Sequence, residues 1–195
     1  MKRTLINVFY LLCLAAFVIF LITDPDFFPN YYQPKLMGVT SLLFGVLVIT
    51  PRLILRTKDT AKRNVVTNLQ LAMIFVLMLS ALGTLGLYRL YKIGFEYDKF
   101  VHLVFTFVAT AVLADFIRIW YGAARSKSVI ISVVLVLTAS IFWEFFEYFL
   151  NKFLDIQIFK VYRGIWRRDT ILDLVYDTLG VVVAVFIKGR RIISS

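Results

Sequence analysis

The feature that most constrains this chain is a series of apolar segments, each about as long as a bilayer is thick. Roughly 20 residues of α-helix cross the hydrocarbon core of a membrane. The apolar runs lie at about residues 5–22, 36–55, 69–88, 98–120, 129–150 and 169–187. They are too long for membrane β-strands, and they lack the alternation of polar and apolar residues that such strands have.

Composition favours the same interpretation. Of the 195 residues, 61% are hydrophobic and only 17% are charged. A soluble domain of this length could not cover so much apolar surface with so few charges. The sequence therefore predicts an all-α, polytopic membrane bundle of about six transmembrane helices. It forms a single membrane domain over residues 1–195, with the lipid bilayer as its partner and no soluble domain.

The distribution of basic residues predicts the topology. The net charge is +10, but the basic residues fall almost wholly between the apolar runs, which argues for headgroup anchoring and against nucleic acid as a partner. With six spans, 13 of the 22 lysines and arginines lie on the side of both termini. The positive-inside rule then predicts a multi-pass protein of the cell (inner) membrane with cytoplasmic termini. The single cysteine, Cys13, lies within the first apolar run and is interpreted as a packing residue.

Half of the acidic residues lie on the last three predicted helices, near one face of the membrane. A charge inside a span costs at least about 2.5–3.5 kcal/mol, so several charges together need mutual partners, water or a metal. The only histidine, His102, lies among them. The six acidic residues are Asp98, Glu144, Glu147, Asp169, Asp173 and Asp177.

The spacing of these residues places them on three helical stripes. Asp98 and His102 are one turn apart, as are Glu144 and Glu147, and the aspartates from Asp169 to Asp177 recur every fourth residue. From the helical rise, the stripes are expected to meet at one depth below the non-cytoplasmic surface.

Two kinds of chemistry fit such a site. A histidine nitrogen with carboxylate oxygens suits one divalent metal ion, of Zn, Mn, Fe or Mg. The predicted metal ligands are His102, Glu144, Glu147, Asp173 and Asp177. The predicted acid–base (catalytic) residues are His102, Glu144 and Glu147, with Asp98 orienting the histidine. The alternative is that these groups satisfy one another and hold three helices together.

A basic, aromatic segment precedes the last helix. It could hold a lipid phosphate above the carboxylates, or act as an ordinary interfacial anchor. The candidate substrate-binding residues are Lys160, Arg163, Arg167 and Arg168. At the opposite end of the fourth helix, Asp115 and Arg118 are three residues apart and are predicted to form a structural pair.

Residues of about 95–187 resemble a known group. The segments are Tyr97-Asp-Lys-Phe-Val-His102, Trp143-Glu-Phe-Phe-Glu147 and the run from Asp169 to Gly180. They are similar to the VanZ-like membrane proteins and more so to the YjdF-like inner-membrane family. VanZ-like proteins commonly have Gln and Asn where this chain has Glu147 and Asp177. The resemblance implies a multi-pass envelope protein and no particular reaction.

Three hypotheses follow. The first is a metal-dependent hydrolase or transferase that acts on a phospholipid or lipid-linked substrate in the outer leaflet. The second is a proton- or cation-coupled transporter that uses the same carboxylates. The third is a non-catalytic envelope protein whose polar cluster only assembles helices.

Overall fold

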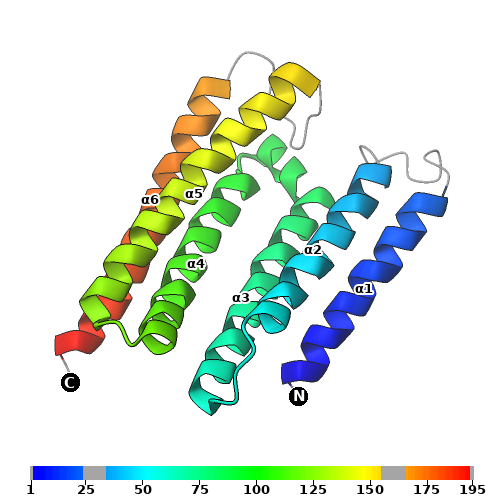
Figure 1. The fold of residues 1–195 in the computed structure, drawn as a ribbon. Coiled ribbons are helices and arrows are strands. Elements are labelled where there is room, and N and C mark those ends of the chain that lie inside the picture. Colours follow the sequence, from blue (N-terminus) through cyan, green and yellow to red (C-terminus); the bar gives the residue numbers. More distant parts are fainter. Residues whose placement is uncertain (1, 24–33, 155–165, 194–195) are drawn as a thin grey trace. The chain divides into compact units, whose positions relative to one another are not determined.

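A computed structural model describes residues 2–23, 34–154 and 166–193, and these residues form helices and no strand. The predicted all-α class is therefore confirmed. The six long helices are α1 (Lys2–Ile22), α2 (Pro34–Ile54), α3 (Thr60–Thr84), α4 (Tyr97–Tyr121), α5 (Arg125–Leu154) and α6 (Trp166–Ile193) (Figure 1). Each contains a segment long and apolar enough to cross a bilayer. The chain is a membrane protein with six candidate spans in contact with lipid.

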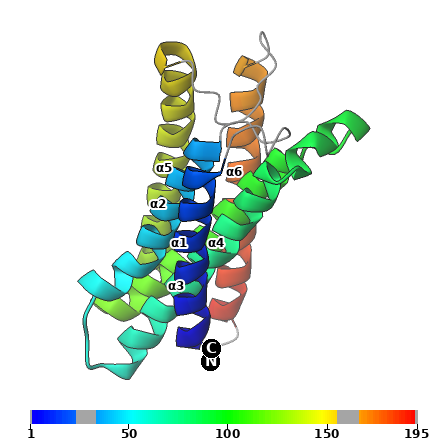
Figure 2. The same ribbon diagram turned by 90° about the vertical axis from the view of Figure 1, so that its right-hand side faces the viewer.

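The helices form two compact units. Unit 1 is Met1–Arg89 and unit 2 is Leu90–Ser195, and the short 3-10 helix η2 (Leu87–Ile93) contains the boundary. In unit 1, α1, α2 and α3 pack on one another, and in unit 2 so do α4, α5 and α6 (Figure 1; Figure 2). That residues 1–195 act as one membrane domain stays a prediction.

The interior of unit 1 is mainly apolar, and its buried Gln70 donates a hydrogen bond from Nε2 to the carbonyl oxygen of Val48 at 2.8 Å. Ile6, Val48 and Ile74, one from each helix, form its buried core. Helices α1 and α2 lie close together at Gly45, where an added Cβ would meet the Cβ of Cys13 at 3.1 Å. Cys13 is buried against this glycine, as expected of a packing residue.

The third helix differs from the sequence prediction of 69–88. It begins at Thr60, because Asp59 caps its first turn by accepting hydrogen bonds from the backbone N–H groups of Ala61 and Lys62. It ends at Thr84, just before Gly86, whose φ of 135° is incompatible with a continuing helix. Hydropathy alone missed the polar first turns of this helix.

In unit 2, α4 and α6 pack closely at a glycine. A Cβ on Gly180 of α6 would clash with the carbonyl oxygen of Leu103 and with Oγ1 of Thr106, both on α4. Small residues permit such close approach of membrane helices, where packing takes the place of hydrophobic association. This contact aligns the polar residues of α4 with those of α6.

Candidate functional site

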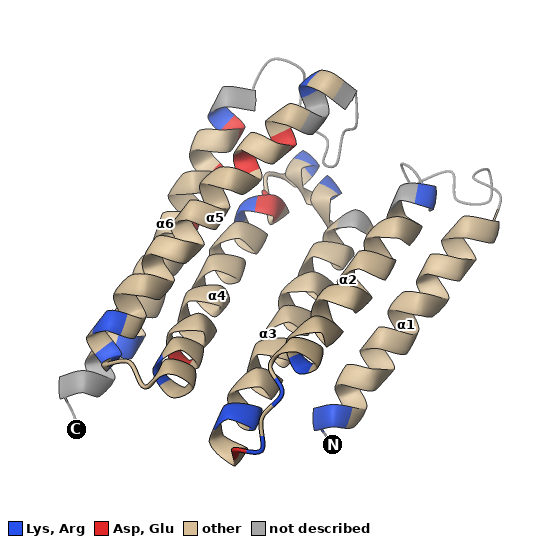
Figure 3. Cartoon of the chain, in the orientation of Figure 1, with Lys and Arg blue, Asp and Glu red and all other residues tan. Residues whose placement is uncertain are grey.

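Most of the acidic positions of unit 2 lie toward the end of the unit where α4 begins (Figure 3), whereas Asp115 lies near the other end of α4. Glu144, Asp173 and Asp177 are each at most 6% exposed, although all carry carboxylates. Burial of charge on this scale requires partners at hydrogen-bonding distance. For Asp173 and Asp177, these partners come from α4.

His102 lies between carboxylates on both sides of its ring. Its Nδ1 is 3.1 Å from Oδ1 of Asp177. Its Nε2 lies 3.6 Å from Oδ1 of Asp173 and 4.0 Å from Oδ1 of Asp98. Sequence spacing assigned the orienting role to Asp98, but the carboxylate nearest to the ring is that of Asp177. A proton on Nδ1 donated to Asp177 leaves the lone pair of Nε2 directed toward the other two aspartates.

A buried lysine, Lys99, connects the aspartates. Its Nζ donates hydrogen bonds to Oδ1 of Asp169 at 2.5 Å and to Oδ1 of Asp173 at 2.6 Å. A longer contact of 3.4 Å joins it to Oδ2 of Asp98. The side chain of Lys99 is only 4% exposed. This ammonium compensates part of the negative charge that α4 and α6 bury together.

Lys99 is the site residue that the sequence reasoning missed. In the sequence analysis, this lysine has no role beyond its place in the Tyr97–His102 segment. Its signal was its place beside Asp98, in the first turn of an apolar span, in a set that held six acids and one histidine. A cluster with that excess of negative charge requires a cation, and Lys99 directly follows Asp98.

Helix α5 brings Glu144 to the same cluster. Helix α5 packs on both α4 and α6, and the charges of His102 and Asp177 lie near enough to Glu144 to act on it. Within the described part of the chain, Oε1 of Glu144 is buried and has no hydrogen-bond partner. The charged groups near Glu147 include Glu144 and Asp98. The predicted convergence of α4, α5 and α6 therefore has a counterpart in the structure.

Three of these side chains could hold a metal ion together. Ligand atoms of Asp98, His102 and Asp173 all lie within 4.8 Å of one another. Two of the three, His102 and Asp173, belong to the predicted ligand set, and Asp98 is an addition. Among the residues described, this group does not include the predicted ligands Glu144, Glu147 and Asp177.

The candidate substrate-binding residues lie mostly outside the described part of the chain, whereas the predicted Asp115–Arg118 pair is described. Lys160 and Arg163 lie outside the described residues, as does the side chain of Arg167, and Arg168 is exposed. At the other end of α4, Arg118 lies 3.9 Å from Asp115, as predicted. A nearer partner is Lys188 of α6, whose Nζ is 2.6 Å from Oδ2 of Asp115.

Comparison with known proteins identifies one family. Residues 5–192 match the family model described as "Predicted membrane protein (DUF2238)". No curated protein and no solved structure matches the chain.

Proposed function

The chain belongs to the DUF2238 family of predicted membrane proteins, and we propose that its unit 2 is a metal-dependent hydrolase or transferase for a lipid or lipid-linked substrate. The observation that carries this proposal is the environment of His102. One ring nitrogen is held by a carboxylate, and the other is turned toward two more.

That environment is the usual one of a metal-binding histidine. Such histidines almost always donate their second ring N–H to a carboxylate, a carbonyl or water, which sets the tautomer and orients the ring. Asp177 supports this role at Nδ1, at 3.1 Å. The remaining donors are then Nε2 of His102 with oxygens of Asp98 and Asp173. One nitrogen and two oxygens suit Zn, Mn, Fe or Mg.

A bound divalent ion would supply Lewis-acid polarisation of a phosphoryl or carbonyl oxygen and a water activated for attack. The chain's own groups would do the rest. Lys99 keeps Asp169 and Asp173 side by side despite their like charges. The unpartnered Oε1 of Glu144 can accept a proton from an attacking water. Asp177 acts as a positioning residue through His102.

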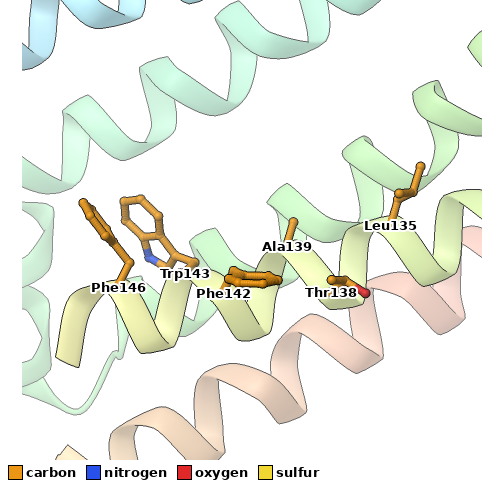
Figure 4. A pocket seen from close by; sticks show the side chains of 6 residues that line it. All are labelled: Leu135, Thr138, Ala139, Phe142, Trp143 and Phe146. Carbon is orange, nitrogen blue, oxygen red and sulfur yellow. The ribbon is translucent and has the colours of Figure 1, made fainter. Parts of the chain in front are cut away.

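The surroundings of the cluster support a substrate with acyl chains. The side chains of a pocket of about 570 Å³ lie along α5, and almost all of them are apolar (Figure 4). Its residues Trp143 and Phe146 directly precede Glu144 and Glu147 in the chain. An acyl chain along this exposed face of α5 would therefore reach the depth of Glu144 and Glu147. The six lining residues are Leu135, Thr138, Ala139, Phe142, Trp143 and Phe146.

We propose further that residues 95–187 are related to the VanZ-like and YjdF-like proteins, and that both termini lie on the cytoplasmic side of the cell membrane. The site would then lie at the level of the outer leaflet. A lipid phosphate would be bound by Lys160, Arg163, Arg167 and Arg168.

The test combines metal binding with lipid turnover. Purified full-length protein in phospholipid nanodiscs should bind a divalent ion, measured with Mn²⁺ and Zn²⁺ separately. Asp177→Asn should weaken that binding by about 10–100-fold, because it removes the carboxylate that orients His102. Asp115→Asn is the matched control, since it removes a carboxylate of α4 far along the helix from His102.

The substrate arm compares nanodisc lipids after incubation with the wild type and with His102→Ala. The proposal expects products that appear with the wild type alone and only when the metal is supplied. The proposed metal-dependent activity would be refuted if the wild type bound neither ion and the lipids were identical in both samples.

A proton or cation carrier is the second candidate, and one observation favours it. Thr106 and Thr110 follow His102 at four-residue intervals on one face of α4, and both are at most 1% exposed. In the described part of the chain, Oγ1 of Thr110 has no hydrogen-bond partner. This row of polar groups leads toward Asp115 and Lys188. Proton flux into liposomes that is abolished by Glu144→Gln would favour the carrier over the enzyme.

A further inference from the structure

Unit 1 has a second polar pocket, at the end where α1 begins, α2 ends and α3 begins. The pocket has a volume of about 230 Å³. Four of its lining residues are arginines, contributed by α1, by the end of α2 and its following loop, and by α3. They are Arg3, Arg52, Arg56 and Arg63. Its apolar lining includes Ile6 of the unit 1 core.

This end of unit 1 carries a strong excess of positive charge. Residues 2–3 and 52–63 contain seven lysines and arginines and one acidic residue, Asp59. Asp59 already accepts hydrogen bonds from the N–H groups of Ala61 and Lys62, at 2.7 and 3.1 Å. Within the described part of unit 1, the four arginines have no carboxylate ion-pair partner.

We propose that this pocket, bounded by Arg3, Arg52, Arg56 and Arg63, binds a phosphate group. A guanidinium presents five N–H donors in a planar fork that matches the oxygens of phosphate. Several arginines from different helices around one pocket can surround such a group, and an anion between them relieves their mutual repulsion. The pocket lies in the other unit from the His102 cluster, so the inference is independent of the proposed enzyme.

The position of the pocket suggests where the phosphate comes from. Because α1, α2 and α3 are long enough to span a bilayer, their ends lie near the level of the headgroups. Clusters of basic residues at that level attract anionic lipids. A phospholipid headgroup and a free phosphate ion share the same chemistry, and the experiment separates them.

The simpler explanation is that the arginines only orient the protein in the membrane. Topology signals depend on charge near the ends of spans and not on geometry. Under that explanation Lys58 is equivalent to Arg63, since both lie in the same basic stretch. Under our proposal they differ, because Arg63 lines the pocket and Lys58 does not. The two residues provide a matched pair.

The experiment is a native mass spectrometry titration of the purified full chain in a phosphate-free detergent. The ligands are phosphatidylglycerol, phosphatidylcholine and inorganic phosphate. We expect phosphatidylglycerol to bind in preference to phosphatidylcholine, whose choline cation opposes the arginines. Arg63→Gln should weaken that binding roughly tenfold, as the loss of one charge-assisted contact implies. Lys58→Gln should change the affinity less than twofold, since Lys58 does not line the pocket.

A displacement measurement shows whether the bound phosphate belongs to a lipid or is free in solution, and a further variant covers the case in which Arg63→Gln misfolds. Displacement of phosphatidylglycerol by millimolar inorganic phosphate would assign the pocket to a soluble phosphate, and resistance to displacement would assign it to lipid. Arg63→Lys keeps the charge and loses the fork, so it should also weaken binding, even if Arg63→Gln fails to fold. The proposed phosphate site would be refuted if Arg63→Gln and Lys58→Gln changed the affinity for phosphatidylglycerol equally. It would also be refuted if none of the three variants changed that affinity.

Discussion

The two units bury different kinds of residue. The core of unit 1 is formed by Ile6, Val48 and Ile74, and its arginines line a pocket at the end of its helices. Unit 2 buries Lys99 and Asp173, each at most 3% exposed, in contact with one another. Long apolar helices are thus held together in unit 1 by packing and by the hydrogen bond of the buried, uncharged Gln70, whereas unit 2 adds buried ions.

The difference indicates where function lies. Lipid is as apolar as leucine, so helices in a membrane associate through packing and hydrogen bonds and do not need buried charges for the purpose. A buried ion cluster is weak evidence for stability, because desolvation offsets much of its attraction. Ionisable groups inside membrane segments accordingly mark functional sites more often than structural ones. Unit 2 is therefore the unit to test for chemistry.

The largest expected effect is that of Lys99→Met. The change leaves Asp169 and Asp173 buried without their cation and should lower the free energy of unfolding by about 3–5 kcal/mol. Unfolding of the purified protein in mixed detergent measures it. Addition of Asp173→Asn should restore part of the loss, because it removes an uncompensated charge. If Lys99→Met lowered the free energy of unfolding by less than about 1 kcal/mol, the cluster would have to be hydrated or arranged differently.

A second, somewhat smaller effect is expected at the contact between α4 and α6. Gly180→Val should destabilise the protein by about 3 kcal/mol, because the Leu103 carbonyl cannot move away without separating the helices. Gly189→Val on the same helix is the control, since nothing lies within 4 Å of its added Cβ. The separation should also weaken metal binding, which distinguishes it from a purely local clash.

In unit 1, truncation of the apolar core tests the other half of the comparison. Ile74→Ala should cost about 2 kcal/mol, through the cavity that it leaves beside Ile6 and Val48. Phe75→Ala, at an exposed neighbouring position, should change stability much less. Metal binding in unit 2 should stay at the wild-type level in both variants. Loss of binding in Ile74→Ala would show that the units are energetically coupled.

The smallest effect is expected for the ion pair at the far end of unit 2. The Asp115 side chain is 42% exposed, although Lys188 lies only 2.6 Å away. Asp115→Asn should therefore lower stability by at most about 1 kcal/mol, and the change should shrink at high salt. A loss as large as that of Lys99→Met would contradict the distinction drawn between buried and exposed pairs.

Much of the site was predictable from helical spacing. The periodicity of Asp98 with His102, and of the aspartates of α6, places each set on one face, and the fold brings those faces together. Spacing along a helix says nothing about how two helices are rotated against each other. It therefore could not decide that Asp177 and not Asp98 lies nearest to the ring of His102. The start of α3 was missed because its first turns are polar, although Asp59 is a recognisable cap.

By itself, the sequence determined that the chain is helical, that it has six candidate spans, and that the last three carry the polar groups. Those properties depend on the local composition and on the helical spacing of residues, and both can be read directly from the amino-acid sequence. Tertiary structure decided the role of Lys99, the grouping of Asp98, His102 and Asp173, and the arginine pocket of unit 1. These depend on distances between helices, which hydropathy does not determine. In unit 2, the close contact of Gly180 with α4 limits the arrangements that the two helices can adopt.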